Sequence, residues 1–85
     1  MREIIEEESF KRCVAELRLS YKRLDEAMEA VGFALCRHPE IFPVVLGTHI
    51  SRLRLSACLD VPESDVWFTY DGQYVRLLHI EVLPE

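Results

Sequence analysis

The feature that most constrains the fold of this sequence is an apolar stripe in its N-terminal half. Apolar side chains recur there at alternating spacings of four and three residues, at Phe10, Val14, Leu17, Tyr21, Leu24, Met28, Val31 and Leu35. This spacing places side chains on one face of an α-helix. Because the phase of the stripe never shifts, we predict one long amphipathic helix from about Glu6 to Arg37. A helical hairpin, in which Ser20 caps a second helix, is the alternative.

The rest of the chain is divided by proline and by strand patterns. Pro39 ends the helix, because the residue before a proline is pushed out of the helical conformation. Beyond it, alternating and β-branched segments predict three strands, at His49–Ser56, Asp65–Tyr70 and Tyr74–Leu83. Asp71-Gly72 predicts a hairpin with a type I′ turn, whose two central residues need positive φ. The expected fold class is α+β: a long N-terminal helix, or a helical hairpin, packed on a three-stranded antiparallel sheet.

The charge distribution separates the two halves of the chain. The 85 residues suit one domain, 1–85, with a helical part at about 6–38 and a sheet part at about 48–83. From Glu40 to Glu85 three arginines stand against seven carboxylates. Proteins bind nucleic acid largely by neutralising its phosphates, so this acidic sheet is a poor platform for RNA or DNA.

Composition also bounds the compartment and the cofactors. No apolar run approaches the roughly 20 residues of a membrane helix, and the N-terminus lacks the apolar core of a signal peptide. Cys13, Cys36 and Cys58 are odd in number and form no CxxC motif, which is typical of reduced thiols. Cys36, His38, His49 and Cys58 match no common zinc spacing. We expect a bacterial cytoplasmic protein with no membrane contact, no cofactor and no metal.

A few polar and aromatic side chains are candidates for a site. Arg52 and Arg54 share one face of the first predicted strand, whereas Arg76 and His79 are three residues apart on the last and so should face opposite ways. The arginines would either converge on a phosphate or a partner carboxylate, or form ion pairs with nearby Asp65, Asp71, Glu81 or the N-terminal glutamates. His79, between apolar neighbours, is more simply a core or edge histidine than a general base.

One aromatic side chain and part of the stripe are candidates for an interface. Trp67 and Phe68 are consecutive on a strand, so one of them points away from the core. The candidate interface comprises this aromatic position and the stripe, at Phe10, Val14, Leu17, Tyr21, Leu24 and Trp67. Four unbroken heptads are long enough to pair with a second copy, so we expect a homodimer or a higher homo-oligomer.

Several segments together resemble one protein family. Tyr21–Ala30, continuing to His38-Pro39-Glu40, resembles the second helix of the RelE/ParE superfamily of toxins, which commonly ends in such a Pro-Glu pair. Ser51–Leu55, Val66–Gly72 and Val75–Ile80 are similar to three consecutive strands of that family. The resemblance covers about residues 20–82 and depends on the order and spacing of these segments.

The resemblance implies an α-helical hairpin on a small antiparallel sheet, and a toxin of a bacterial toxin–antitoxin pair. Such toxins are ribosome-dependent mRNA interferases or gyrase inhibitors, and a segment of a cognate antitoxin neutralises them. This sequence departs from the pattern, because the N-terminal strand looks lost or shrunken. Of the basic residues of the nucleases, only Arg52 and Arg54 have matches here, since the last strand ends Val82-Leu83-Pro84-Glu85.

We therefore expect a toxin-like module that acts through protein–protein contact, without nuclease catalysis. Two alternatives stay open. One is a ribosome-dependent mRNA endoribonuclease that uses Arg52 and Arg54, with Arg76 or His79 as weaker candidates. The other is a stand-alone oligomeric interaction domain with no toxin role.

Overall fold

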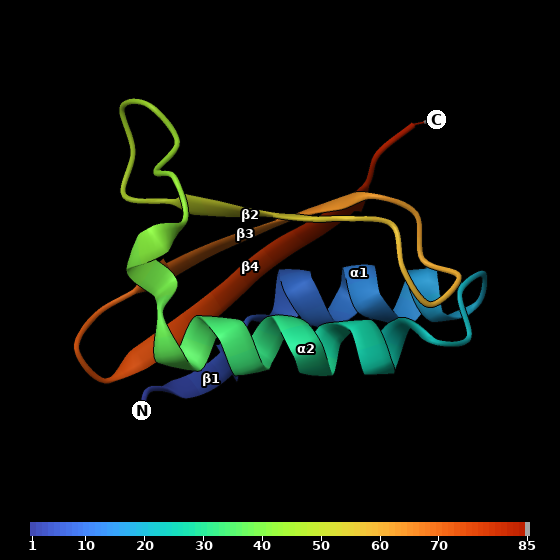
Figure 1. The fold of residues 1–85 in the computed structure, drawn as a ribbon, viewed down its shortest axis with the longest axis horizontal. Coiled ribbons are helices and arrows are strands. Elements are labelled where there is room, and N and C mark those ends of the chain that lie inside the picture. Colours follow the sequence, from blue (N-terminus) through green and yellow to red (C-terminus); the bar gives the residue numbers. More distant parts are fainter. Residues whose placement is uncertain (85) are drawn as a thin grey trace.

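The structure, a computed structural model, describes residues 1–84 and so leaves Glu85, the last residue of the predicted domain, outside the description. The elements follow the order β1 (Glu3–Glu6), α1 (Glu8–Arg18), α2 (Leu24–Arg37), the short 3-10 helix η1 (Pro39–Ile41), β2 (Ser51–Leu55), β3 (Ser64–Tyr70) and β4 (Tyr74–Val82). In Figure 1 both helices lie below β2 and β3. Within residues 1–84, no helix has the length and apolar character needed to cross a membrane.

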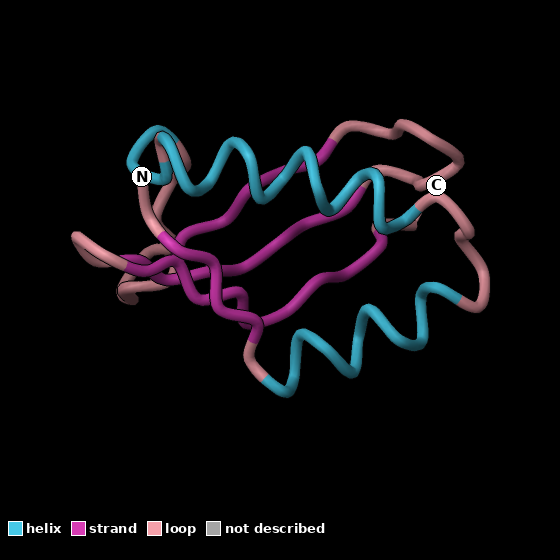
Figure 2. Tube along the Cα trace, turned by 90° about the horizontal axis from the view of Figure 1, so that it is seen from below, coloured by secondary structure: helices cyan, strands magenta, loops and turns pink. Residues whose placement is uncertain are grey.

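The apolar stripe forms two helices, so the prediction of one long helix is wrong and the hairpin alternative is confirmed (Figure 2). The chain turns between Arg18 and Leu24, where the backbone N–H of Tyr21 donates to Leu17 O at 2.9 Å. Tyr21 stays half-buried against the core inside this turn. The spacing of the stripe therefore stays regular because its members all pack against one core, and not because they belong to one continuous helix. Ser20 does not cap α2, because Arg23 occupies that position without a side-chain hydrogen bond.

The stripe supplies one wall of the hydrophobic core. Five of its members are buried, and Leu17, Tyr21 and Met28 are partly buried beside them. The opposite wall comes from the strands, chiefly Leu53, Val66, Phe68, Val75, Leu77 and Ile80. Burial of one such side chain contributes about 1.5–3 kcal/mol. Both helices therefore pack on the same face of the sheet.

The sheet has four strands in the order β1-β4-β3-β2, and so is not the three-stranded antiparallel sheet that we predicted. The three predicted strands are confirmed at β2, β3 and β4. The additional strand, β1, runs parallel to β4, with Ile4 beside Val75. Two isoleucines between charged residues were too short a pattern to identify it from sequence. The N-terminal strand that looked lost or shrunken is therefore present, although it has only four residues.

The predicted hairpin joins β3 to β4, but its turn is of another kind. Gly72 does not take positive φ. Instead the carboxylate of Asp71 accepts the backbone N–H groups of Gln73 and Tyr74, at 2.7 and 2.8 Å, and these hydrogen bonds hold the pKa of Asp71 below its ordinary value. The side chain of Asp71 thus closes the loop in place of the left-handed backbone that we predicted.

A turn with two positive φ angles occurs instead between β2 and β3. Leu59 and Asp60 have φ of 50° and 66°. Cys58 and Val61 flank them and exchange two backbone hydrogen bonds, at 2.9 and 2.7 Å. This is the backbone of a type I′ turn, which usually takes Asn-Gly or Asp-Gly. Leucine and aspartate in these positions carry strain.

Replacing Asp60 by glycine tests this strain. We expect the free energy of unfolding of Asp60→Gly to rise by about 0.5–1 kcal/mol, because relief of the left-handed backbone exceeds the entropy that glycine adds to the unfolded chain. Gly72→Ala is the matched control, since a Cβ there meets nothing within 4 Å and φ is not positive. It should change stability by less than about 0.5 kcal/mol. A loss of stability in Asp60→Gly, measured by urea unfolding, would contradict the assignment.

Candidate functional site

The face of the sheet away from the helices carries the polar candidates. Arg52 lies opposite Trp67, and Arg54 lies opposite Asp65, so these four side chains share that face. On β4 the register shifts: Trp67 pairs with His79 and Phe68 with Leu77, which leaves Leu78 without a partner. This β-bulge brings His79 onto the same face as Arg76. The prediction that these two residues face opposite ways is therefore wrong.

Each arginine on this face has an acidic neighbour. Arg54 binds both carboxylate oxygens of Asp65 and also lies 3.2 Å from Glu63. The hydrogen bond to Asp65 raises the pKa of Arg54 above its ordinary value. Arg52 lies 4.0 Å from the same Asp65, whose residue is only 4% exposed. The arginines therefore form ion pairs with nearby acidic residues, which is the second of the two arrangements predicted from the sequence.

Arg76 and His79 belong to separate clusters. Arg76 lies 3.5 Å from Glu7, beside β1. His79 is exposed, its ring centroid is 5.4 Å from that of Trp67, and its Nδ1 is 3.2 Å from Cys13 Sγ. Trp67 is thus the aromatic that points away from the core, whereas Phe68 is fully buried. The described residues hold no group of His, Cys, Asp and Glu side chains placed to bind a metal ion.

The stripe is not available as the interface that we predicted. Phe10, Val14 and Leu24 are core residues, at most 3% exposed. Leu17 and Tyr21 are partly buried and pack on the same core. The sheet of the same chain therefore occupies the surface that a second copy would need.

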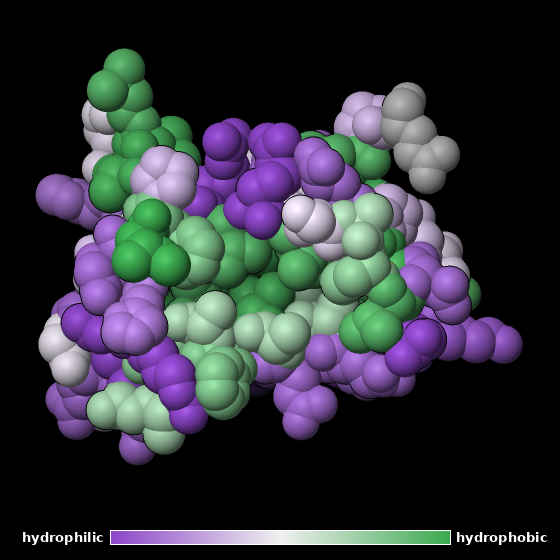
Figure 3. All heavy atoms as spheres, viewed as in Figure 1, coloured by the Kyte–Doolittle hydropathy of each residue, from purple (hydrophilic) through white to green (hydrophobic). Residues whose placement is uncertain are grey.

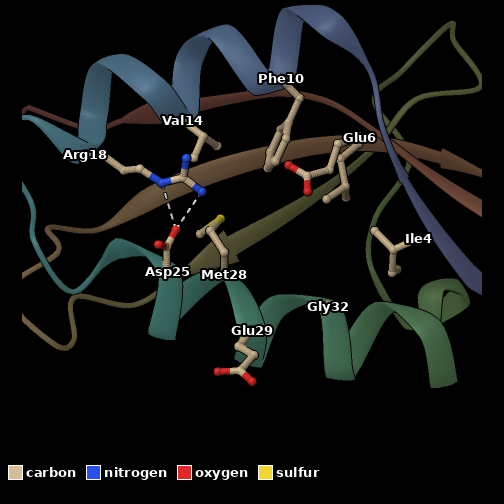
Figure 4. A pocket seen from close by; sticks show the side chains of 10 residues that line it. Ile4, Glu6, Phe10, Val14, Arg18, Asp25, Met28, Glu29 and Gly32 are labelled. Carbon is tan, nitrogen blue, oxygen red and sulfur yellow. Dashed lines mark hydrogen bonds and ion pairs between the residues drawn. The ribbon is translucent and has the colours of Figure 1, made fainter.

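A hollow of about 250 Å³ lies between the two helices, and Phe10 and Val14 form part of its floor (Figure 4). Arg18 and Asp25 close one end of it with an ion pair of 2.8 Å. Glu29 points away from the hollow in this view. Its lining is mixed, and its arginine is neutralised within the chain, so this hollow presents no concentrated charge to a ligand.

An apolar groove lies between α2 and β2. Figure 3 shows this face, on which apolar side chains line a hollow between the helix and the strand. The groove has a volume of about 370 Å³, and it is lined on the helix by Ala30, Val31 and Ala34 and on the other side mainly by Phe42, Leu53, Leu55 and Cys58. The two alanines are one helical turn apart, and their small side chains keep the groove open.

A protruding apolar loop adjoins the groove. Residues 42–50 fold back as a narrow hairpin, in which Val45 N–H donates to Ile50 O at 2.7 Å and Arg52 N–H donates to Pro43 O at 2.9 Å. Leu46 at its tip is 98% exposed, and Val44 is 57% exposed. The loop is visible at the upper left of Figure 1. Exposed apolar groups gathered in this way mark an interaction surface.

The edge of β2 beside the groove is partly unpaired. Strand β2 is the last in the sheet order, and Pro43–Val45 covers it only as far as Arg52. Backbone groups alternate in direction along a strand, so the N–H and C=O of Arg54 point outward as those of Arg52 do. Within residues 1–84 no strand pairs with Arg54 on that side. This edge offers backbone hydrogen bonds to another chain.

The arginines of this region were predicted from the sequence, but the groove was not. The only sign of the groove in the sequence is the apolar run from Ile41 to Leu46, which lies outside any predicted strand and is interrupted by Pro43.

Replacing Asp65 by alanine tests whether its ion pairs with Arg52 and Arg54 stabilise the fold. We expect Asp65→Ala to lower the free energy of unfolding by about 1.5–3 kcal/mol, since it removes a buried acceptor of charged hydrogen bonds. Glu63→Ala is the matched control, because Glu63 contacts the same Arg54 but is exposed. It should cost less than about 0.5 kcal/mol. Equal effects of the two substitutions in urea unfolding would count against a structural role for Asp65.

Comparisons with known proteins give no relative for the chain. No family model matches it, and neither a curated protein nor a solved structure does. Function must therefore be inferred from the residues and the geometry of the chain.

Proposed function

We propose that this chain is a protein-binding module of the toxin-like kind that its sequence resembles, and that it acts by contact rather than by RNA cleavage. Its docking surface is the groove between α2 and β2, together with the loop 42–50. The observation that carries the proposal is this continuous apolar surface, which the fold itself leaves uncovered.

The occupant that fits best is an extended segment of a partner protein. Its backbone would pair with the outward N–H and C=O of Arg54, in the manner of an added β-strand. Every second side chain of such a segment would point into the groove, where Ala30 and Ala34 leave room for it. Apolar side chains at those positions would pack on the groove lining that Leu53 and Leu55 provide.

The order of the elements supports a toxin-like fold. A short strand, a helical hairpin and three strands follow one another along the chain. The resemblance implied this hairpin and an N-terminal strand, and the sequence alone had not revealed that strand. In a type II toxin–antitoxin pair, the partner segment would belong to a cognate antitoxin.

The ion pairs argue against the endoribonuclease alternative. A phosphate at Arg52 and Arg54 would have to compete with Asp65, which is buried and already holds both guanidinium groups close. Arg76 is paired with Glu7, on the far side of the sheet order from β2. No set of free guanidinium groups is gathered on the described part of this face.

Self-association is the second candidate, and the open edge favours it. Two copies of β2 paired antiparallel would place the apolar loop of each copy beside the C-terminal end of the other copy's β2. There the loop would meet the end of the groove near Leu55 and Cys58. This arrangement replaces the helix-to-helix contact predicted from the stripe.

A charged substitution in the groove tests the proposal. The chain is expressed in bacteria, alone and together with the protein encoded beside its gene. We expect growth to slow with the chain alone and to recover with the partner. Ala30→Glu, on the exposed wall of the groove, should abolish recovery and weaken binding of the purified partner at least about tenfold, because a buried unpaired carboxylate costs more than 1.4 kcal/mol.

Ala15→Glu, on the exposed side of α1, is the matched control and should bind like the unmodified chain. Growth that is unaffected in every case would refute the toxin part of the proposal. Equal binding by the two variants would refute the groove. A dimer in light scattering that Leu46→Lys dissociates would favour self-association instead, and mRNA cuts lost in an Arg52→Ala/Arg54→Ala variant would favour the nuclease.

A further inference from the structure

The three cysteines of this chain have different surroundings. Cys58 is exposed, whereas Cys13 and Cys36 are half-buried. Cys36 Sγ lies 3.4 Å from Phe33 O and 3.4 Å from an Arg37 nitrogen. Cys13 Sγ lies 3.2 Å from Nδ1 of His79, a residue 66 positions away in the sequence. Cys13 therefore has a neighbour that can accept its proton.

The β-bulge is what brings this pair together. Strand β1 covers β4 only as far as Leu77, and beyond that point α1 runs beside β4. Ser9, one turn before Cys13 on α1, donates a hydrogen bond to the carbonyl of the bulged Leu78. The next residue, His79, then lies beside Cys13. The link from helix to bulge thus fixes the distance between the thiol and the imidazole.

The imidazole is also held from a second side. The Trp67 ring lies 5.4 Å from it, centroid to centroid, at an interplanar angle of 42°. A nucleophile within hydrogen-bond reach of a base that a third group orients is the arrangement that activates cysteine. Here the thiol is Cys13, the base is His79 and the orienting group is Trp67.

We propose that Cys13 is the reactive thiol of this chain, a modification site for soft electrophiles such as alkyl halides and disulfides. The thiol proton passes to Nδ1 of His79, whose other ring nitrogen carries the hydrogen. The sulfur lone pair then forms a bond to the electrophilic carbon or sulfur. The bond to the leaving group breaks, and that group departs with the electron pair as iodide or as a thiolate. The imidazolium finally returns its extra proton to water.

This inference is independent of the proposed function, and it opposes what exposure alone predicts. If exposure governed reactivity, Cys58 would be modified first. An ordinary thiol is only a few per cent thiolate at neutral pH, so a proton acceptor within contact can raise the rate about tenfold. Trp67 is the only tryptophan of the chain, and its ring contacts His79, so its fluorescence reports on this site.

Alkylation with a limiting amount of iodoacetamide at neutral pH tests the proposal, with the adduct on each cysteine measured by mass spectrometry over time. We expect Cys13 to react about tenfold faster than Cys58 and faster than Cys36, with a change in Trp67 fluorescence that follows the Cys13 adduct. In His79→Gln the rate at Cys13 should fall to that of Cys58 or below, while the other two rates stay the same. His49→Gln, at an exposed loop histidine, is the matched control and should change none of the three.

Two results would overturn the proposal. One is Cys58 or Cys36 reacting first in the unmodified chain. The other is a Cys13 rate that His79→Gln leaves unchanged. If circular dichroism shows that His79→Gln does not fold, the order of the three rates in the unmodified chain decides alone.

Discussion

The packing of both helices against one face of the sheet is the constraint on which the rest of this structure depends. Phe10 and Val14 from α1 share a core with Leu24, Val31 and Leu35 from α2. Because a strand alternates its side chains, burying one face leaves the other to polar groups. The arginines and His79 therefore lie together on the face away from the helices, with Asp65 buried opposite Arg54. The groove forms along the flank of α2 that the strands do not reach.

Much of this fold could be predicted from sequence, and the failures share a cause. Burial of the stripe and the places of three strands followed from periodicity. The turn after Arg18 did not, because Tyr21 remains packed on the core and keeps the phase. The bulge at Leu78 and the left-handed Leu59-Asp60 turn are set by the tertiary structure, against local preference. Local patterns reveal what is buried better than how the chain turns.

The candidate sites were harder to predict, because they depend on contacts between distant segments. Arg52 and Arg54 were identified as neighbours, with Asp65 as one of several possible acidic partners, but the strand register is what places Asp65 opposite Arg54. The groove could not be predicted because it forms only where α2 and β2 lie side by side in the fold. Cys13 and His79 gave no sequence signal as a pair, since the bulge that joins them does not show in the pattern of β4. The candidate residues could therefore be predicted from the sequence, whereas their contact partners depend on the fold.

The central claim is that a partner segment pairs with the open edge of β2. Hydrogen exchange, measured on the chain alone and bound to the protein encoded beside its gene, tests it most directly. The backbone N–H of Arg54 points outward and should exchange rapidly in the free chain. We expect the partner to slow exchange at Arg54, while Trp67 and His79 on the helix-free face stay unchanged. Protection confined to Trp67 and His79, with Arg54 still exchanging rapidly, would contradict this account.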